Sequence, residues 1–233
     1  MRYSDAERFP IKHLREHASA EEFFAAIAKK TKAEDRRGGV LLVGGVSPRD
    51  LAVRNAQTEL RLDKLPSYWS HAALILDWKD GAKLRDVVGA EVTLDPIEPH
   101  KKVPERNGVT LFRLERYADR QRYPNLAFGT ICSPKTGLKD RIQDAALKPN
   151  RDRLRYHLWE WLGAWSIYTY TPATSPNPVL NGIPLPGAAF CEYAYEAAGL
   201  DLTPGATAPN ACPELLWTTL LRGTTASRTK SAR

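Results

Sequence analysis

Residues 187–199 have the sequence GAAFCEYAYEAAG and predict a short helix that carries one cysteine. Pro184 and Pro186 precede it and favour an extended approach, because the proline ring fixes φ and disfavours helical backbone in the residue before it. Small and aromatic residues then recur at helical spacing, at Cys191, Ala194, Tyr195 and Ala198. Gly199 is a typical helix stop, so the helix is expected to end there.

Cys191 is expected in the first turn of this helix, where two interpretations compete. The positive end of the helix dipole favours a thiolate, so the pKa of the Cys191 thiol should lie below its ordinary value of about 8.5. Alternatively, a cysteine beside Phe190 and several alanines is a small buried core residue.

Two further stretches predict neighbouring strands that carry a histidine and an acid. Residues 68–77, YWSHAALILD, place His71 near the start of a buried strand. Residues 86–92, DVVGAEV, place Glu91 on the next strand. Asp80-Gly81 lies between them and is a hairpin signal, so the two strands should be antiparallel.

The sequence therefore predicts an α+β fold with an antiparallel sheet packed against the late cysteine helix. Strands are expected at Val40–Val43, Leu74–Asp77, Val87–Val92 and Val109–Leu114. Helices are expected after the capping box Ser19–Glu22, at Pro48–Leu60, at Asp152–Tyr168 and at Pro213–Leu221. Residues 117–150 alternate too weakly to assign, apart from a short helix at Asp140–Leu147, and suit an insertion over a cleft.

A chain of 233 residues is long enough for one sizeable core and is expected to be a single domain. Residues 1–17 are polar and irregular and predict a surface arm, and the basic residues 222–233 predict a disordered tail.

Three short motifs, taken together, resemble a known group of enzymes. Ser70-His71 begins one strand, Gly89-Ala90-Glu91 lies on the next, and Phe190-Cys191-Glu192 lies on a late helix. This order is similar to that of the circularly permuted papain-like thiol hydrolases, the permuted branch of the NlpC superfamily, to which lecithin retinol acyltransferase is related. In that branch the histidine strand precedes the cysteine helix, as His71 precedes Cys191 here. The resemblance covers roughly residues 40–217.

The resemblance implies a permuted papain-like fold and a catalytic triad. Cys191 would be the nucleophile, His71 the base, and Glu91 the group that orients the imidazole. The backbone N–H of Cys191 would be one oxyanion donor, and the region of Tyr68 or Ser70 a second. No cofactor and no metal ion are implied.

Each residue of this triad also has an ordinary structural interpretation. A lone histidine near a strand end is usually structural. Cys132 and Cys212 show that cysteines also occur close to prolines in expected loops, where they are weak nucleophile candidates. An odd count of three cysteines without close pairs argues against a disulfide framework and against a structural zinc site.

The composition bounds the partners and the location. A net charge of +7 favours anionic polymers such as acidic lipid or the bacterial wall, but no nucleic-acid-binding motif accompanies it. No apolar run is long enough for a transmembrane segment, and the N-terminus lacks the apolar core of a secretory signal. Synthesis in the cytoplasm is expected, and any export to a target-cell periplasm would use a signal-independent route.

Three function classes fit these observations. The first is a thiol amidase or endopeptidase that cuts bacterial cell-wall peptide as an antibacterial effector, with an immunity or secretion-carrier protein as partner. The second is an acyl-lipid hydrolase or acyltransferase of the lecithin retinol acyltransferase type. The third is a non-catalytic module that binds wall or lipid.

Overall fold

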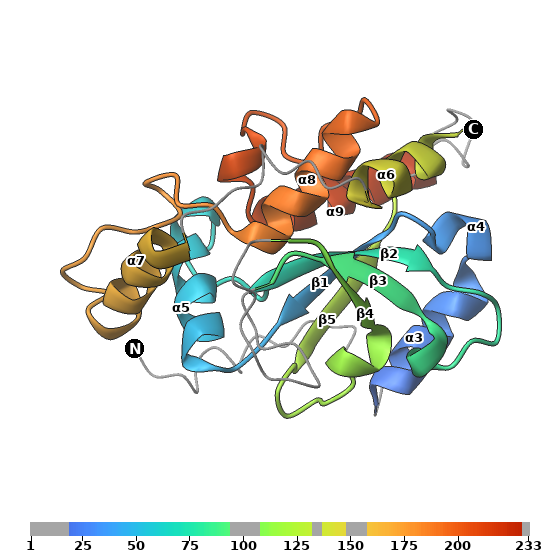
Figure 1. Cartoon of the computed structure of the whole chain (residues 1–233), viewed down its shortest axis with the longest axis horizontal. Helices are drawn as coiled ribbons and strands as arrows, with labels where there is room; N and C mark the ends of the chain where they lie inside the picture. Colours follow the sequence, from blue (N-terminus) through green and yellow to red (C-terminus); the bar gives the residue numbers. More distant parts are fainter. Residues whose placement is uncertain (1–18, 94–107, 132–136, 148–157, 230–233) are drawn as a thin grey trace.

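The computed structural model describes residues 19–93, 108–131, 137–147 and 158–229, with side chains described from 161 to 222 in the last range. Its strands are β1 (Val40–Gly44), β2 (His71–Asp77), β3 (Val88–Glu91), β4 (Thr110–Arg113) and β5 (Asn125–Gly129). They form one antiparallel sheet in the order β4-β3-β2-β1-β5 (Figure 1). The expected α+β class with an antiparallel sheet is confirmed.

The α-helices of the described residues lie before, between and after the strands along the chain. They are α3 (Ala20–Lys30), α4 (Ala33–Arg36), α5 (Pro48–Ala56), α6 (Leu138–Leu147), α7 (Leu158–Tyr170), α8 (Pro186–Ala197) and α9 (Pro213–Thr229). Short 3-10 helices are η1 (Gln57–Leu60), η2 (Leu84–Asp86), η3 (Leu114–Tyr117) and η4 (Ala208–Asn210). None of these described helices is both long and apolar enough to span a membrane.

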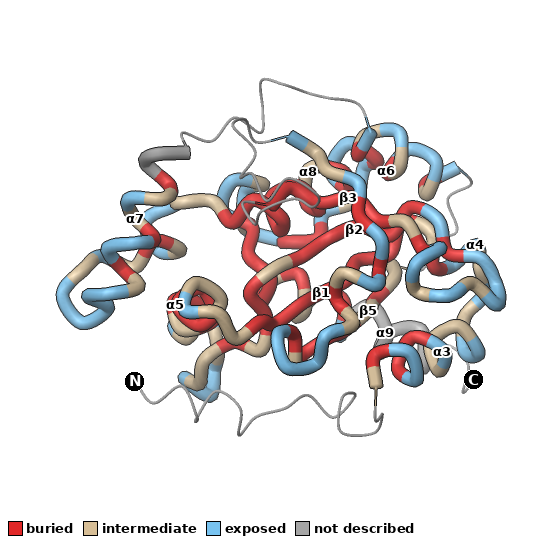
Figure 2. The backbone as a smooth tube through the Cα atoms, turned by 60° about the horizontal axis from the view of Figure 1, so that its bottom comes forward, coloured by how far each residue is buried: buried red, intermediate tan, exposed pale blue. Residues whose placement is uncertain are grey.

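The sheet separates two hydrophobic cores, because successive side chains of a strand point to opposite faces. In β1 and β2, even-numbered residues such as Leu42 and Leu74 join the first core, beneath α8, and odd-numbered residues such as Leu41 and Ile75 join the second core. Figure 1 shows α6, α8 and α9 on one side of the sheet and α3 on the other. Figure 2 shows that the central strands are buried along their length. The helix α3 starts at the expected cap, where the Ser19 side chain accepts the backbone N–H of Glu22.

The connection between β2 and β3 is longer than the tight hairpin that Asp80-Gly81 predicts. Strand β3 begins at Val88, one residue after the predicted start at Val87, and η2 precedes it. Trp78, just past β2, is buried in the second core, where the guanidinium of Arg36 lies over its ring. Because this large side chain is buried, the chain does not turn back directly after β2, and the connection to β3 is longer than a tight hairpin.

Residues 117–150 supply a strand and a helix of the main fold, so their interpretation as an insertion was wrong. Strand β5 pairs with the whole of β1, and α6 packs on α8. Four of the five residues of β5 are buried, which removes the alternation of polar and apolar residues that reveals a half-exposed strand.

Helix α9 continues to Thr229, beyond the end predicted at Leu221 and into the expected disordered tail. Residues 222–229 contain no proline, and extending a helix is far easier than starting one. The predicted arm at residues 1–17 lies outside the described residues.

Candidate active site

His71 and Glu91 lie side by side at one end of the sheet. His71 is the first residue of β2 and pairs with Val43 of β1. Val43 belongs to the second core. Glu91 ends β3 and is fully buried. The imidazole Nε2 lies 2.8 Å from Glu91 Oε2. The structure thus brings together two of the three residues of the expected triad.

Two neighbours hold the Glu91 carboxylate in place. The Tyr117 hydroxyl donates to Oε2, and Arg116 Nη1 lies 3.4 Å from Oε1. Burial alone would raise the pKa of Glu91, but the hydrogen bond and charge of His71 and the charge of Arg116 bring it below its ordinary value. Burial raises the pKa of Tyr117 well above its ordinary value, and the charge of Glu91 adds to this, so the phenol remains a donor. Glu91 is therefore an ionised acceptor at neutral pH.

An ionised Glu91 fixes the tautomer of the neutral imidazole. A carboxylate only accepts hydrogen bonds, so His71 Nε2 must donate and carry the proton. In the neutral ring Nδ1 then holds the lone pair. This nitrogen is the one available for chemistry.

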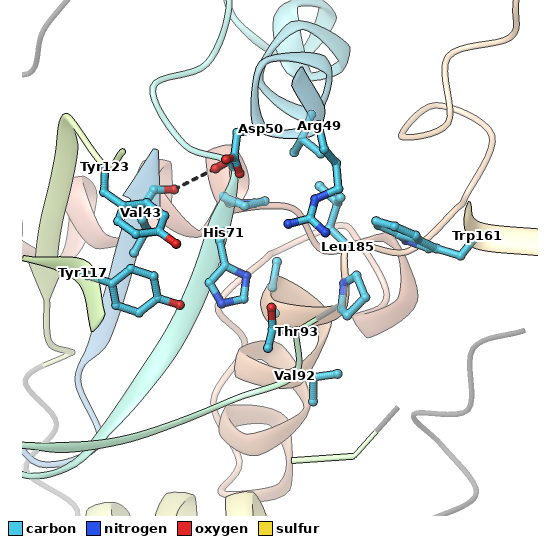
Figure 3. Close-up of a pocket in the computed structure, with 16 residues that line it drawn as sticks. Val43, Arg49, Asp50, His71, Val92, Thr93, Tyr117, Tyr123, Trp161 and Leu185 are labelled. Atoms are coloured by element: carbon cyan, nitrogen blue, oxygen red, sulfur yellow. Dashed lines mark hydrogen bonds between the residues drawn. The ribbon is translucent and has the colours of Figure 1, made fainter. Parts of the chain in front are cut away.

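A small cavity of about 40 Å³ opens beside His71. Arg49, Ser70 and Thr93 line it, together with Gly187 in the first turn of α8 (Figure 3). In the close-up the His71 ring stands between the Tyr117 hydroxyl on one side and the Arg49 guanidinium on the other. A cavity of this size has room for water or for one small polar group.

The first turn of α8 meets the imidazole through Gly187. A Cβ atom at this position would lie 2.5 Å from His71 Cε1 and 2.6 Å from Nδ1, and would also collide with the carbonyl oxygen of Ala72. The close approach therefore requires glycine. In the expected triad, a nucleophile in the first turn of the helix would face the histidine, but here that place has no side chain.

Cys191 does not make the expected contact with His71. Helix α8 starts at Pro186, so Cys191 lies in its second turn, and its side chain belongs to the first core with none of its surface exposed. His71 pairs with Val43, and Gly89, two residues before Glu91, pairs with Phe112; both partners belong to the second core. His71 and Glu91 therefore lie on the face of the sheet that bears the second core, whereas Cys191 packs on the other face. Cys191 is also not among the residues that line the cavity.

The expected low pKa of the Cys191 thiol is wrong as well. Burial raises this pKa well above its ordinary value, and the charges of Glu192 and Glu91 add to the effect. Among the described residues, the Cys191 thiol makes no hydrogen bond. The core interpretation of this cysteine is the one that the geometry favours. Cys212 is likewise buried, and Cys132 lies outside the described residues.

The two weak oxyanion candidates are both engaged elsewhere. Ser70 lines the cavity, but its hydroxyl accepts the Gly45 N–H at 3.1 Å and donates to the Val43 carbonyl at 3.4 Å. Tyr68 is not among the lining residues, and its ring lies under the Arg61 guanidinium, 5.1 Å from the ring centre.

Arg49, Arg116 and Tyr117 are the site residues that sequence reasoning missed. The dipeptide Arg116-Tyr117 begins two residues after Leu114, the end of the strand predicted at residues 109–114, and that position close to a strand end was the available signal. Arg49 had none. Among the residues that the structure describes, no three His, Cys, Asp or Glu side chains form a group that could hold a metal ion.

Comparison of the chain with protein-family models, with curated proteins and with solved structures gave no match.

Proposed function

We propose that His71, oriented by Glu91, is the general base of a hydrolase that uses water as its nucleophile. The observation that carries the proposal is the 2.8 Å contact between His71 Nε2 and the buried Glu91 carboxylate, which leaves Nδ1 as a base next to a cavity of water-sized dimensions. A carboxylate in this place fixes the tautomer and stabilises the imidazolium that forms when the ring takes a proton.

The reaction follows from this arrangement. His71 Nδ1 takes a proton from water, and the resulting hydroxide attacks the carbonyl carbon of the substrate. The first N–H groups of a helix have no partner within the helix, and Gly187 and Ala188 of the first turn of α8 line the cavity, so their N–H groups would be the donors that stabilise the oxyanion. The imidazolium then returns its proton to the leaving group, which departs with the carbonyl–heteroatom bond broken.

The bond proposed is an amide of bacterial cell-wall peptide, and the protein is proposed to be an antibacterial effector. The net charge of +7, which suits an anionic wall polymer, supports this class. An immunity protein or a secretion carrier would be its protein partner. The experiment below also includes acyl esters, because the same base would catalyse hydrolysis of an ester or of an amide.

Hydrolysis of purified cell wall and of a panel of acyl esters tests the proposal with three variants. His71→Ala should lower the rate by about 10²–10⁴-fold, the usual contribution of a general base. Glu91→Gln should lower it too, because the amide does not stabilise the imidazolium. Cys191→Ala should stay within a few-fold of the wild type. Loss of activity in a folded Cys191→Ala protein would overturn the water mechanism and restore the cysteine triad.

A non-catalytic binding module is the second candidate, and one observation favours it. Gly187 leaves no nucleophile in the first turn of α8, and the adjoining cavity is only about 40 Å³. This candidate predicts that wild type and His71→Ala bind cell wall equally in a pull-down assay and that neither hydrolyses any member of the panel.

A further inference from the structure

A charge-free part of the chain stands at one edge of the molecule. Residues 161–191 contain no Asp, Glu, Lys, Arg or His, although 26% of the residues of the whole chain are charged. Residues 161–185, most of α7 and the chain that leads to α8, are here named the uncharged projection. Figures 1 and 2 both show α7 and the loop after it at the edge of the molecule, beyond α5.

The inner side of the uncharged projection is fixed to the rest of the protein. Trp161 and Tyr168 are buried in the first core. The Tyr168 hydroxyl accepts from the side-chain amide of Asn55, in α5, at 3.2 Å. Trp161 Nε1 donates to the Pro184 carbonyl at 2.7 Å and so joins the two ends of the projection. The projection is therefore a built part of the fold.

The outer side of the uncharged projection exposes large apolar side chains. Ile167 and Tyr170 of α7 are 60% and 82% exposed, and Leu180 in the following loop is 56% exposed. Residues three apart lie on the same face of a helix, so Ile167 and Tyr170 are neighbours on the side away from the core. A surface helix normally turns charged and polar residues to this side. Here the outward face of α7 carries apolar ones.

The polar side chains of the uncharged projection are engaged with backbone carbonyls. The donating side chains and the residues whose carbonyls accept, at 2.6–2.8 Å, are Thr169 to Trp165, Thr171 to Ile167, Ser175 to Thr171, Asn177 to Ala56 and Asn181 to Asn177. A partner recognised through hydrogen bonds, such as a polysaccharide, gains little from donors that are already used. Entry into lipid, in contrast, requires that polar groups find their partners within the protein.

We propose that the uncharged projection is a membrane-docking surface, and that Ile167, Tyr170 and Leu180 enter the headgroup region of an anionic bilayer. A charged side chain would lose hydration there, so the absence of charge removes the largest cost of entry. Tyrosine is enriched at the boundary between membrane and water. The net charge of +7 lies wholly outside residues 161–191 and attracts the rest of the protein to anionic lipid.

Docking would also bring the cavity beside His71 to the lipid surface. Trp161 and Leu185, at the two ends of the uncharged projection, both line that cavity. The docking surface itself stands on its own contacts and does not depend on the proposed hydrolase activity.

Sedimentation of the full chain with vesicles tests the docking surface without any turnover. The vesicles contain phosphatidylcholine mixed with phosphatidylglycerol. Wild type should sediment with them, and part of the binding should persist at high salt, because salt screens charges but not apolar burial. The double variant Ile167→Gln/Leu180→Gln keeps the net charge and should bind at least about tenfold more weakly, since two apolar side chains no longer leave water.

Leu62→Gln/Leu111→Gln is the matched control, because Leu62 and Leu111 are exposed leucines outside the uncharged projection. It should bind vesicles as tightly as wild type. Far-UV circular dichroism checks that each variant is folded.

Several results would overturn the docking surface. They are the absence of wild-type binding, equal binding by wild type and Ile167→Gln/Leu180→Gln, and binding that high salt abolishes completely. Two other occupants of this face would also overturn it. A wild-type dimer in sedimentation velocity that becomes monomeric in the double variant would assign the face to a second copy of the chain. Retention on purified cell wall that the double variant loses, without vesicle binding, would assign it to a wall polymer.

Discussion

Glu192 offers a test of the packing of α8 that does not depend on any activity. Its side chain lies in the second turn of the helix and is only 3% exposed. The carboxylate accepts the Leu202 N–H at 3.2 Å and the Thr203 hydroxyl at 2.9 Å, and so joins α8 to the loop that follows it. Burial raises the pKa of Glu192 from its ordinary 4.5 to about 7, and the nearby charges of Asp201 and Glu196 act in the same direction.

The pKa of Glu192 sets both the sign and the size of the effect. Between pH 4.5 and about 7 the folded protein keeps a proton that the unfolded chain has released, so the free energy of unfolding must fall as the pH rises through this window. The fall ends above the folded pKa. The rise from 4.5 to about 7, at 1.36 kcal/mol for each pKa unit, amounts to about 3 kcal/mol.

Glu192→Gln removes this titration and keeps the geometry. The amide oxygen can accept the Leu202 N–H, and the amide nitrogen can donate to the Thr203 hydroxyl. Relative to wild type, the variant should therefore gain about 3 kcal/mol of stability between pH 4 and pH 8.

Urea unfolding at half-unit steps of pH measures the difference, with Asp144→Asn as control because Asp144 is an exposed acid of α6. The control should show no comparable rise. A difference between Glu192→Gln and wild type that stays flat from pH 4 to pH 8, or grows toward acid, would refute the reasoning.

Three further substitutions probe the site and the core. Gly187→Ala should cost about 1–3 kcal/mol of stability in urea unfolding and displace His71, which would show as a lower hydrolysis rate; an unchanged rate would mean that the ring need not touch α8. Tyr117→Phe should cost about 1–3 kcal/mol, because it removes a hydrogen bond to the buried Glu91 carboxylate, and an unchanged urea midpoint would contradict that bond. Cys191→Ser should be less stable than Cys191→Ala, since a buried hydroxyl without a partner costs about 1–3 kcal/mol; the reverse order would place the thiol in a polar setting.

The neighbourhood of His71 and Glu91 could be predicted because it depends on local rules. Two consecutive antiparallel strands pair as neighbours, and the alternation of side chains puts both residues on one face. The outcome depends on the register, in which Leu74 pairs with Ala90 and Ile75 with Gly89, so that odd-numbered residues near this end of both strands share a face.

The place of Cys191 could not be predicted as reliably, because it depends on where a helix begins. A proline is favoured at the first helical position, so α8 starts at Pro186, and Cys191 moves from the first turn to the second. At 3.6 residues per turn, Gly187 and Cys191 then share one side of the helix, and the glycine comes to lie at the imidazole. The observed start at Pro186 differs from the predicted start at Gly187 by a single residue, but the prediction placed Cys191 one turn too early and so took a core residue for a site residue.

Local sequence rules could not predict the positions of strand β5, Tyr117 and Arg49, for a different reason. Strand β5 pairs with β1, far away in sequence, and Tyr117 reaches Glu91 only after β4 has returned the chain to the sheet. Such contacts depend on the whole topology. In the sequence Arg49 looks like any other arginine, and its position in the lining of the cavity is known only from the structure.

The reactivity of the buried thiols of Cys191 and Cys212 would measure how often the first core opens transiently. Both lie on the α8 and α9 side of the sheet, and burial raises the pKa of each. An alkylating reagent at neutral pH therefore reaches them only when that layer of helices comes away from the sheet. When closing is faster than alkylation, the ratio of the rate in the native protein to that in the unfolded chain gives the equilibrium constant of this opening. Cys191 lies within α8 and Cys212 immediately before α9, so unequal ratios would divide the layer into parts that open separately.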